Sequence, residues 1–185
     1  MFNIDKIIGC ENNDIAEKIK NLYNQILEKC HIINSIEVAE ASKLLENVQR
    51  DVNIALINEI SILFDKLGID TYRVLDAAST KWNFLNFKPG LVGGHCIGVD
   101  TNYLLKNADD LKIKLPLSVN ARYVNEMMPQ IVAEKIFSII KTTKKQLKIL
   151  VLGLTYKSNV PDFRNSKVFD LINILEQKNI RCILH

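Results

Sequence analysis

Residues 36–67 read IEVAEASKLLENVQRDVNIALINEISILFDKL, the longest helical pattern in this 185-residue chain. Apolar side chains recur at helical spacing, at positions 45, 48, 52, 55, 56, 60, 63, 64 and 67. Ser35 is a favoured N-cap, Glu37 suits the first turn, and Gly68 is a common stop signal. The stretch therefore predicts one helix of about 48 Å, at roughly 1.5 Å per residue, which suits the spine of a helical domain, a subunit interface or both.

Composition narrows the class of protein. With 48% hydrophobic and 24% charged residues, the chain is typical of a soluble globular protein, with one domain or one domain and part of another. The net charge of +3 is too small to indicate nucleic-acid binding. No apolar run approaches the roughly 18 to 20 residues of a membrane span, and the opening MFNIDKIIGCENND lacks the features of a signal peptide. We therefore expect a cytoplasmic protein with no membrane or nucleic-acid partner.

Four cysteines lie far apart without a C-x-x-C pair, at Cys10, Cys30, Cys96 and Cys182. This spacing favours reduced thiols over disulfides or a zinc site. A single His-Cys pair also lacks the further ligands that a metal needs, so no metal site is expected.

On the N-terminal side of the long helix, the pattern predicts a short strand at 4–10, a helix at 13–30 and a short apolar segment at 31–34. On its C-terminal side, it predicts helices at 71–80, 100–108 and 118–140, with an extended loop at 81–99. Pro129 is expected to kink or locally interrupt the last of these helices.

The C-terminal part predicts a β-α-β unit. The polar stretch KTTKKQ (141–146) is the best domain boundary; the buried strand LKILVLGLTYK, ending at Gly153, a helix at about 165–177 and the strand IRCIL follow it. Two parallel strands and one helix cannot bury a parallel sheet on both faces. We therefore expect a truncated sequence, or one that is completed by another chain.

The segment PGLVGGHCIGVD (89–100) holds four of the seven glycines, around His95 and Cys96. Glycines allow a ligand to approach the main chain, whose N–H groups can hold anionic oxygens. A tight turn would explain one or two glycines but four less well. The pattern favours a ligand-binding loop.

Cys96 is the candidate nucleophile, although a lone cysteine is most often a small buried hydrophobe. A reactive thiol must be accessible and near cations or a helix N-terminus. Asp100 would disfavour a thiolate, so a cation must come from elsewhere in the fold; Asp100 fits an N-cap equally well. Adjacent residues of an extended chain point to opposite sides, so His95 is expected to be structural. A cysteine hydrolase would need His31 or His185 to reach Cys96.

Two further pairs of polar residues carry weaker signals. Lys43 and Asn47 lie one turn apart on the long helix and point the same way, although such a pair alone is usually a solvated face. Lys157 and Arg164 flank a polar loop after the strand, where α/β sheets commonly bind ligands, and two cations there suit phosphate.

Together these residues resemble the UDP-glucose/GDP-mannose type of nucleotide-sugar dehydrogenase over almost the whole chain. AEASKLLENVQRDVNIALINE (39–59) resembles the central helix, PGLVGGHCIGVD the catalytic loop, and LGLTYKSNVPDFRNS (152–166) the first turn of the C-terminal domain. The His-Cys form of the loop, with KWNFLNFKPG (81–90) before it, is most similar to members that act on UDP-N-acetylhexosamines.

The resemblance implies NAD-dependent oxidation of a sugar C6 alcohol to a carboxylate, in polysaccharide biosynthesis. It implies that Cys96 holds the aldehyde as a thiohemiacetal and then a thioester. Lys43 and Asn47 would stabilise the oxyanion, Asp100 would act through water, and Lys43 would supply the missing cation. The substrate-binding residues would be Phe87, Lys88, Gly90, Gly93, Tyr156 and Lys157. Arg164 would reach the NAD pyrophosphate, and the 36–67 helix would pair two subunits as a homodimer.

The expected fold class is α+β: a mainly helical central dimerisation domain with a long helix, then a truncated Rossmann-like α/β unit. The expected domains are the end of an NAD-binding domain (1–34), a helical central domain (35–140), a linker (141–146) and the start of a UDP-sugar-binding domain (147–185).

The chain departs from the family pattern at two points. Asp100-Thr101-Asn102-Tyr103 stands where the subgroup has Asp-Pro-Tyr-Tyr, and no G-x-G-x-x-G follows a strand. The second departure predicts that the chain is a fragment that is inactive alone. The alternative is a non-catalytic dimerisation remnant of a truncated gene.

Overall fold

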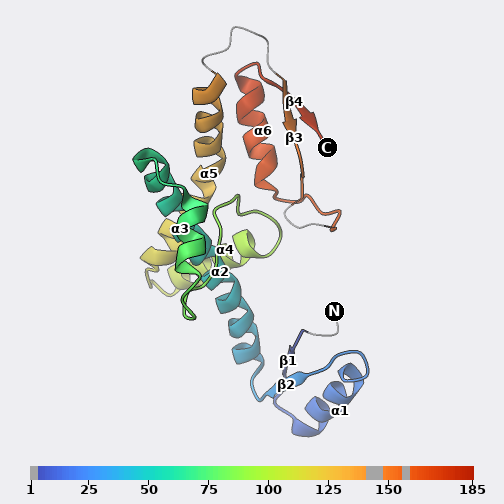
Figure 1. Ribbon diagram of the computed structural model, residues 1–185. Helices are drawn as coiled ribbons and strands as arrows, with labels where there is room; N and C mark the ends of the chain where they lie inside the picture. The colour runs from blue at the N-terminus through green and yellow to red at the C-terminus, as the bar shows by residue number, and fades with distance from the viewer. Residues whose placement is uncertain (1–3, 141–147, 156–158) are drawn as a thin grey trace. The chain divides into compact units, whose positions relative to one another are not determined.

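The computed structural model describes residues 4–140, 148–155 and 159–185 (Figure 1). Its elements in chain order are β1 (Lys6–Gly9), α1 (Asn13–Tyr23), β2 (Cys30–Ile33), α2 (Ile36–Leu67), α3 (Thr71–Ala78), α4 (Ile97–Asp110), α5 (Pro116–Ile140), β3 (Lys148–Val151), α6 (Lys167–Gln177) and β4 (Arg181–Leu184). The chain divides into two compact units, Met1–Glu46 and Asn47–His185, and α2 contributes to both.

The first unit contains a parallel pair of strands joined by a helix. Strands β1 and β2 pair from Lys6 with Cys30 to Gly9 with Ile33, and α1 connects them. Asn12 caps α1, because its side chain accepts a hydrogen bond from the Ile15 N–H at 3.1 Å.

The helix predicted at 13–30 is shorter than expected, since α1 ends at Tyr23. The chain turns after this residue, and the Leu27 N–H donates to the Tyr23 carbonyl at 2.9 Å. The turn allows Leu27 to pack with Ile8 and Cys30 in a small core, instead of extending the apolar face of the helix. The apolar residues after Tyr23 thus have helical spacing in the sequence, but they belong to a turn that packs against β1.

Helix α2 begins and ends where the sequence predicts. The Val38 N–H donates to the Ser35 hydroxyl at 3.1 Å, which confirms Ser35 as the N-cap. Hydrogen bonds from its own backbone and from Ser35 lower the pKa of the Glu37 carboxyl. At the other end, Gly68 has a φ of 70°, the left-handed conformation that terminates helices.

The two helices after the loop differ from the prediction. Helix α4 begins at Ile97 instead of residue 100, because the Cys96 carbonyl already accepts from the Asp100 N–H at 2.8 Å. Helix α5 begins at Pro116, and proline is well tolerated in a first turn. The expected local interruption is wrong, since α5 continues through Pro129 although proline has no N–H to donate.

The C-terminal segment forms the predicted β-α-β unit, but the expectation of a buried first strand is wrong, since β3 ends at Val151 and its Lys148 and Leu150 are exposed. Strands β3 and β4 are parallel, in register from Lys148 with Arg181 to Val151 with Leu184. Helix α6 lies beside them and also contacts α5, as Figure 1 shows. This arrangement confirms the α+β class, in which a helical part is followed by a partial Rossmann-like unit. The predicted linker at 141–146 lies outside the described residues, so the domain limits stay predictions.

None of the helices within the described residues has the length and apolar character that crossing a membrane requires.

Candidate active site

Cys96 lies in the segment 89–100, which we call the cysteine loop. Its thiol is exposed, and the residue occupies the N-cap position of α4. The Cys96 carbonyl accepts hydrogen bonds from Asp100 at 2.8 Å and Val99 at 3.2 Å, which fixes its backbone to the first helical turn. The structure therefore presents the sulfur at the start of a helix, where a ligand can reach it.

Asn47 and Asp100 are brought into direct contact. The Asn47 amide donates to an Asp100 carboxylate oxygen at 2.5 Å. Asn47 is buried with 1% exposure, whereas Asp100 is half-buried. The N-cap role considered for Asp100 is wrong, since Asp100 lies inside the first turn of α4 and Cys96 takes that place. Two predicted site residues thus meet one helical turn from the thiol.

Lys43 belongs to the first unit, and its role beside Cys96 stays a prediction. Its ammonium group lies 3.0 Å from a Glu46 carboxylate oxygen, and its side chain is mostly exposed.

Three predicted substrate-binding residues surround one pocket of about 240 Å³. Lys88, Gly90 and Gly93 line it, together with Ile97, the residue after Cys96. Phe87 precedes them and is half-buried. The structure therefore brings part of the predicted sugar site together beside Cys96. Tyr156 and Lys157 lie outside the described residues.

Gly93 has a packing role that the sequence did not reveal. A Cβ at this position would lie 2.5 Å from the Asn165 carbonyl oxygen and 3.0 Å from the Lys167 nitrogen. The neighbouring Gly94 N–H donates to the same Asn165 oxygen at 3.0 Å, and Gly94 has a φ of 88°. The cysteine loop is thus held directly against the start of α6.

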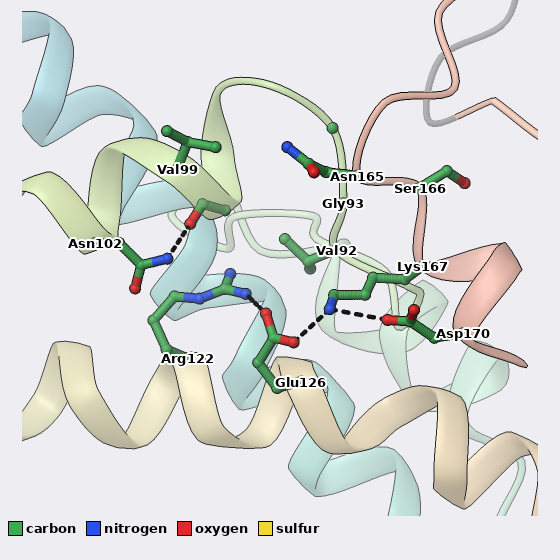
Figure 2. Close-up of a pocket in the computed structure, with 12 residues that line it drawn as sticks. Val92, Gly93, Val99, Asn102, Arg122, Glu126, Asn165, Ser166, Lys167 and Asp170 are labelled. Carbon is green, nitrogen blue, oxygen red and sulfur yellow. Dashed lines mark hydrogen bonds and ion pairs between the residues drawn. The ribbon is translucent and has the colours of Figure 1, made fainter.

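A second pocket, of about 320 Å³, lies between the cysteine loop, α4, α5 and the start of α6 (Figure 2). Figure 2 shows Arg122 and Lys167 converging on the Glu126 carboxylate. Lys167 also donates to Asp170 at 3.0 Å. Burial alone would lower the pKa of Lys167, but its hydrogen bonds to Glu126 and Asp170 outweigh burial and raise it. Because both cations are paired within the chain, this pocket is a junction between elements and not an open anion site.

Arg164, which was predicted to bind the cofactor, donates two side-chain hydrogen bonds to Asp162. Its Nε and Nη2 atoms donate to the two carboxylate oxygens at 2.9 and 2.7 Å. These hydrogen bonds, more than the nearby charge of His95, lower the pKa of Asp162 to about 2. A contact between Arg164 and NAD therefore stays a prediction.

Within the described residues, no glycine-rich turn of the kind that holds a dinucleotide pyrophosphate leads from a strand into a helix. The turn between β1 and α1 has Glu11, with Asn12 capping the helix and Asp14 in its first turn.

Sequence reasoning missed the buried polar residues beneath the cysteine loop. Asp51 and Asn58 on α2, and Asn125 on α5, are fully buried. The available signal was the recurrence of polar side chains at 47, 51 and 58, which share one face of a helix.

Known proteins similar to this chain are nucleotide-sugar dehydrogenases. The sequence model of the central domain of the UDP-glucose/GDP-mannose dehydrogenase family matches residues 37–127, and that of the family's UDP binding domain matches residues 150–185. The chain is 43% identical to a UDP-N-acetyl-D-glucosamine 6-dehydrogenase of Pseudomonas aeruginosa, covering 97% of this chain and 43% of the relative. It is 44% identical to the Salmonella typhi enzyme of the same name, covering 95% and 42%.

Solved structures that are similar to this chain are also nucleotide-sugar dehydrogenases. The UDP-N-acetyl-mannosamine dehydrogenase Cap5O from Staphylococcus aureus has a TM-score of 0.81 and 34% identity, over 100% of this chain and 44% of that one. A UDP-D-ManNAc dehydrogenase from Pyrococcus horikoshii has a TM-score of 0.83 and 33% identity, over 98% and 43%. The chain therefore spans less than half the length of these relatives.

Proposed function

Because the chain belongs to the UDP-glucose/GDP-mannose dehydrogenase family, we propose that it is the sugar-binding and nucleophile-bearing part of a UDP-N-acetylhexosamine 6-dehydrogenase. The observation that carries the proposal is the position of Cys96. Cys96 is exposed at the N-cap of α4, one helical turn from the Asn47–Asp100 pair. It also lies next to the pocket that Lys88, Gly90 and Gly93 line. This arrangement suits covalent capture of a sugar carbon.

The chemistry assigned to Cys96 is addition to the C6 aldehyde of the sugar. A carbon–sulfur bond forms, the carbonyl π electrons move to oxygen, and the thiol proton ends on that oxygen, which gives a thiohemiacetal. Covalent capture prevents the aldehyde from escaping between two oxidations. NAD is the proposed oxidant, and the oxidations belong to a cofactor site that the described residues do not form.

Oxidation of the captured adduct leaves a thioester, and Asp100 then assists its hydrolysis. Water adds to the thioester carbon, the carbon–sulfur bond breaks, and the carboxylate and the thiol are released. Asp100 accepts a proton from the water. Asn47 and Lys43 stabilise the negative charge that develops on the C6 oxygen.

Substrate binding is assigned to Phe87, Lys88, Gly90 and Gly93 in the helical part, and to Tyr156 and Lys157 in the β-α-β unit. Arg164 is assigned to the NAD pyrophosphate in the complete enzyme. The product would be a UDP-N-acetylhexosaminuronic acid for polysaccharide biosynthesis in the cytoplasm.

Protection of Cys96 by substrate tests this function. We expect UDP-N-acetylglucosamine to slow the alkylation of Cys96 by iodoacetamide, measured by peptide mass spectrometry. Cys182, which is half-buried on β4, is the internal control and should react at an unchanged rate. Equal alkylation of Cys96 at every sugar concentration would contradict the proposal.

We also expect no NADH from this chain with UDP-N-acetylglucosamine and NAD+, since no G-x-G-x-x-G motif that could hold the NAD pyrophosphate follows a strand in its sequence. Turnover by the purified chain would contradict this expectation.

A further inference from the structure

The buried face of α2 binds the cysteine loop at both of its ends. Asn58 holds the first end, because it accepts from the Gly90 N–H at 2.8 Å and donates to the Gly90 carbonyl at 3.0 Å. At the second end, Asn47 donates to Asp100 and Asp51 accepts from the Thr101 hydroxyl at 3.0 Å. Cys96 therefore lies on a segment that is anchored on either side of it.

Asp51 is the centre of the second anchor. Its carboxylate is fully buried, and one oxygen accepts from Arg122 at 2.8 Å and from Asn125 at 2.7 Å. The other oxygen accepts from Thr101. A buried carboxylate is costly unless it is paired and fully hydrogen-bonded. Here the cluster fixes where Thr101 must lie.

Thr101 transmits this constraint to the nucleophile. It is fully buried in α4, and its hydroxyl also lies 3.2 Å from the carbonyl of Ile97, the first residue of the helix. The preceding Asp100 N–H donates to the Cys96 carbonyl. Anchoring Thr101 to Asp51 therefore fixes the first turn of α4, and that turn fixes the Cys96 backbone. A proline, which the resembled pattern has at this position, carries no hydroxyl to make this bond.

We propose that Thr101 and Asp51 are positioning residues that orient Cys96 for addition to the sugar aldehyde. The inference rests on the proposed role of Cys96 as the nucleophile. Both side chains are fully buried between α2 and α4, so neither is exposed to a ligand. Their loss should lower covalent capture without weakening substrate binding, whereas a merely structural defect would weaken both.

The first test compares Thr101→Val, which keeps the shape but removes the hydroxyl, with Thr101→Ser, which restores it. We expect Thr101→Val to lower the thiohemiacetal fraction about threefold to tenfold at saturating UDP-N-acetylglucosamine 6-aldehyde, the size of one lost hydrogen bond. Carbon-13 NMR measures the adduct and calorimetry measures UDP-N-acetylglucosamine binding, which should not change. Thr101→Ser should restore the adduct.

The matched control is Thr80→Val, since the Thr80 hydroxyl bonds only locally, to the Ala77 carbonyl at 2.8 Å. If Thr101→Val does not fold, Asp51→Asn replaces it and should lower the adduct in the same direction. A wild-type adduct fraction in the folded variant, or an equal loss in Thr101→Ser, would overturn the inference.

A second readout is independent of the chemistry. Amide hydrogen exchange at Val99 and Asp100, whose N–H groups bond to the Cys96 carbonyl, should quicken about threefold to tenfold in Thr101→Val. Unchanged exchange would overturn the positioning inference even if the wild-type chain forms the adduct. Faster exchange without any wild-type adduct would support the anchor and refute the proposed function of Cys96.

Discussion

Gly93 leaves no space for a side chain, because the cysteine loop passes so close to the start of α6. Gly93→Ala should destabilise the chain by about 1–3 kcal/mol, the usual cost of an overpacked site, since its Cβ would lie 2.5 Å from the Asn165 oxygen. Urea unfolding measures this difference. Gly90→Ala is the matched control, with nothing within 4 Å of the added Cβ. Equal stability of the two variants would contradict the close packing.

The low pKa of Asp162 makes its contribution to stability depend on pH in the acid range. Its folded pKa of about 2 lies below the ordinary value of 3.8, mainly because Arg164 donates to it. The ionised carboxylate therefore stabilises the folded chain at pH values above the ordinary pKa of 3.8. This stabilisation is lost as the pH falls towards about 2.

Replacing the partner should reverse this shift. In Arg164→Met, the pKa of Asp162 should rise towards 3.8, as measured by NMR titration of its carboxyl carbon. Arg181→Met, a change at an exposed arginine of β4, should leave it at about 2. Because the backbone N–H of residue 164 still donates to Asp162 in this variant, a pKa that stays at about 2 would exclude the Arg164 side-chain hydrogen bonds as its main cause.

At the scale of single residues, the sequence predicted candidate site residues and missed the residues that support the cysteine loop. Cys96, Asn47 and Asp100 were singled out, since their types and spacing carry chemistry and resemble a family motif, and their catalytic roles stay predictions. Asp51 and Thr101 were not, because their role depends on a contact between α2 and α4 that no local pattern encodes.

At the scale of elements, predictions succeeded where local signals agreed. Helix α2 has a cap, a periodic interior and a glycine stop, and its limits were correct. The predicted start of α4, residue 100, is later than the observed start at Ile97. Gly98 and the glycines before Cys96 are poor helix formers, so the sequence pattern of the first turn does not indicate a helix. Pro129 does not break α5, which packs against α4 and α6.

The apolar positions of α2 do not all face the core. The buried residues in its second part are Asn47, Val48, Asp51, Ala55 and Asn58. Leu56, Leu63 and Leu67 share another stripe and are 49–60% exposed. The apolar repeat of α2 is therefore divided between a buried face and an exposed leucine stripe, and such a stripe is typical of a surface that pairs with another subunit.

We expect this stripe to support the proposed homodimer. Leu56→Glu with Leu63→Glu should convert a dimer to a monomer, because charges in the centre of an apolar interface are costly to bury. Light scattering with size exclusion measures the mass. Glu59→Gln with Asp65→Asn, at exposed positions of the same helix, should leave the dimer intact. A monomeric wild-type chain, or a dimer in the leucine variant, would contradict this interface.

At the scale of the whole molecule, the structure joins a helical part that carries Cys96 to a β-α-β unit that contacts the cysteine loop. The sequence predicted both parts through their motifs. It could not predict their junction, in which Glu126 on α5 binds Lys167 on α6 and Gly94 bonds to Asn165. Such contacts join residues far apart in the chain and leave no periodic signal.

The most direct test of the central claim is carbon-13 NMR of UDP-N-acetylglucosamine 6-aldehyde labelled at C6 and bound to this chain. Because capture of the aldehyde needs no cofactor, the wild-type chain should produce a resonance of a sulfur-bonded C6. Cys96→Ser should abolish it, whereas Cys182→Ser should retain it. Absence of the resonance in the wild type, or its persistence in Cys96→Ser, would contradict the assignment of Cys96 as the nucleophile.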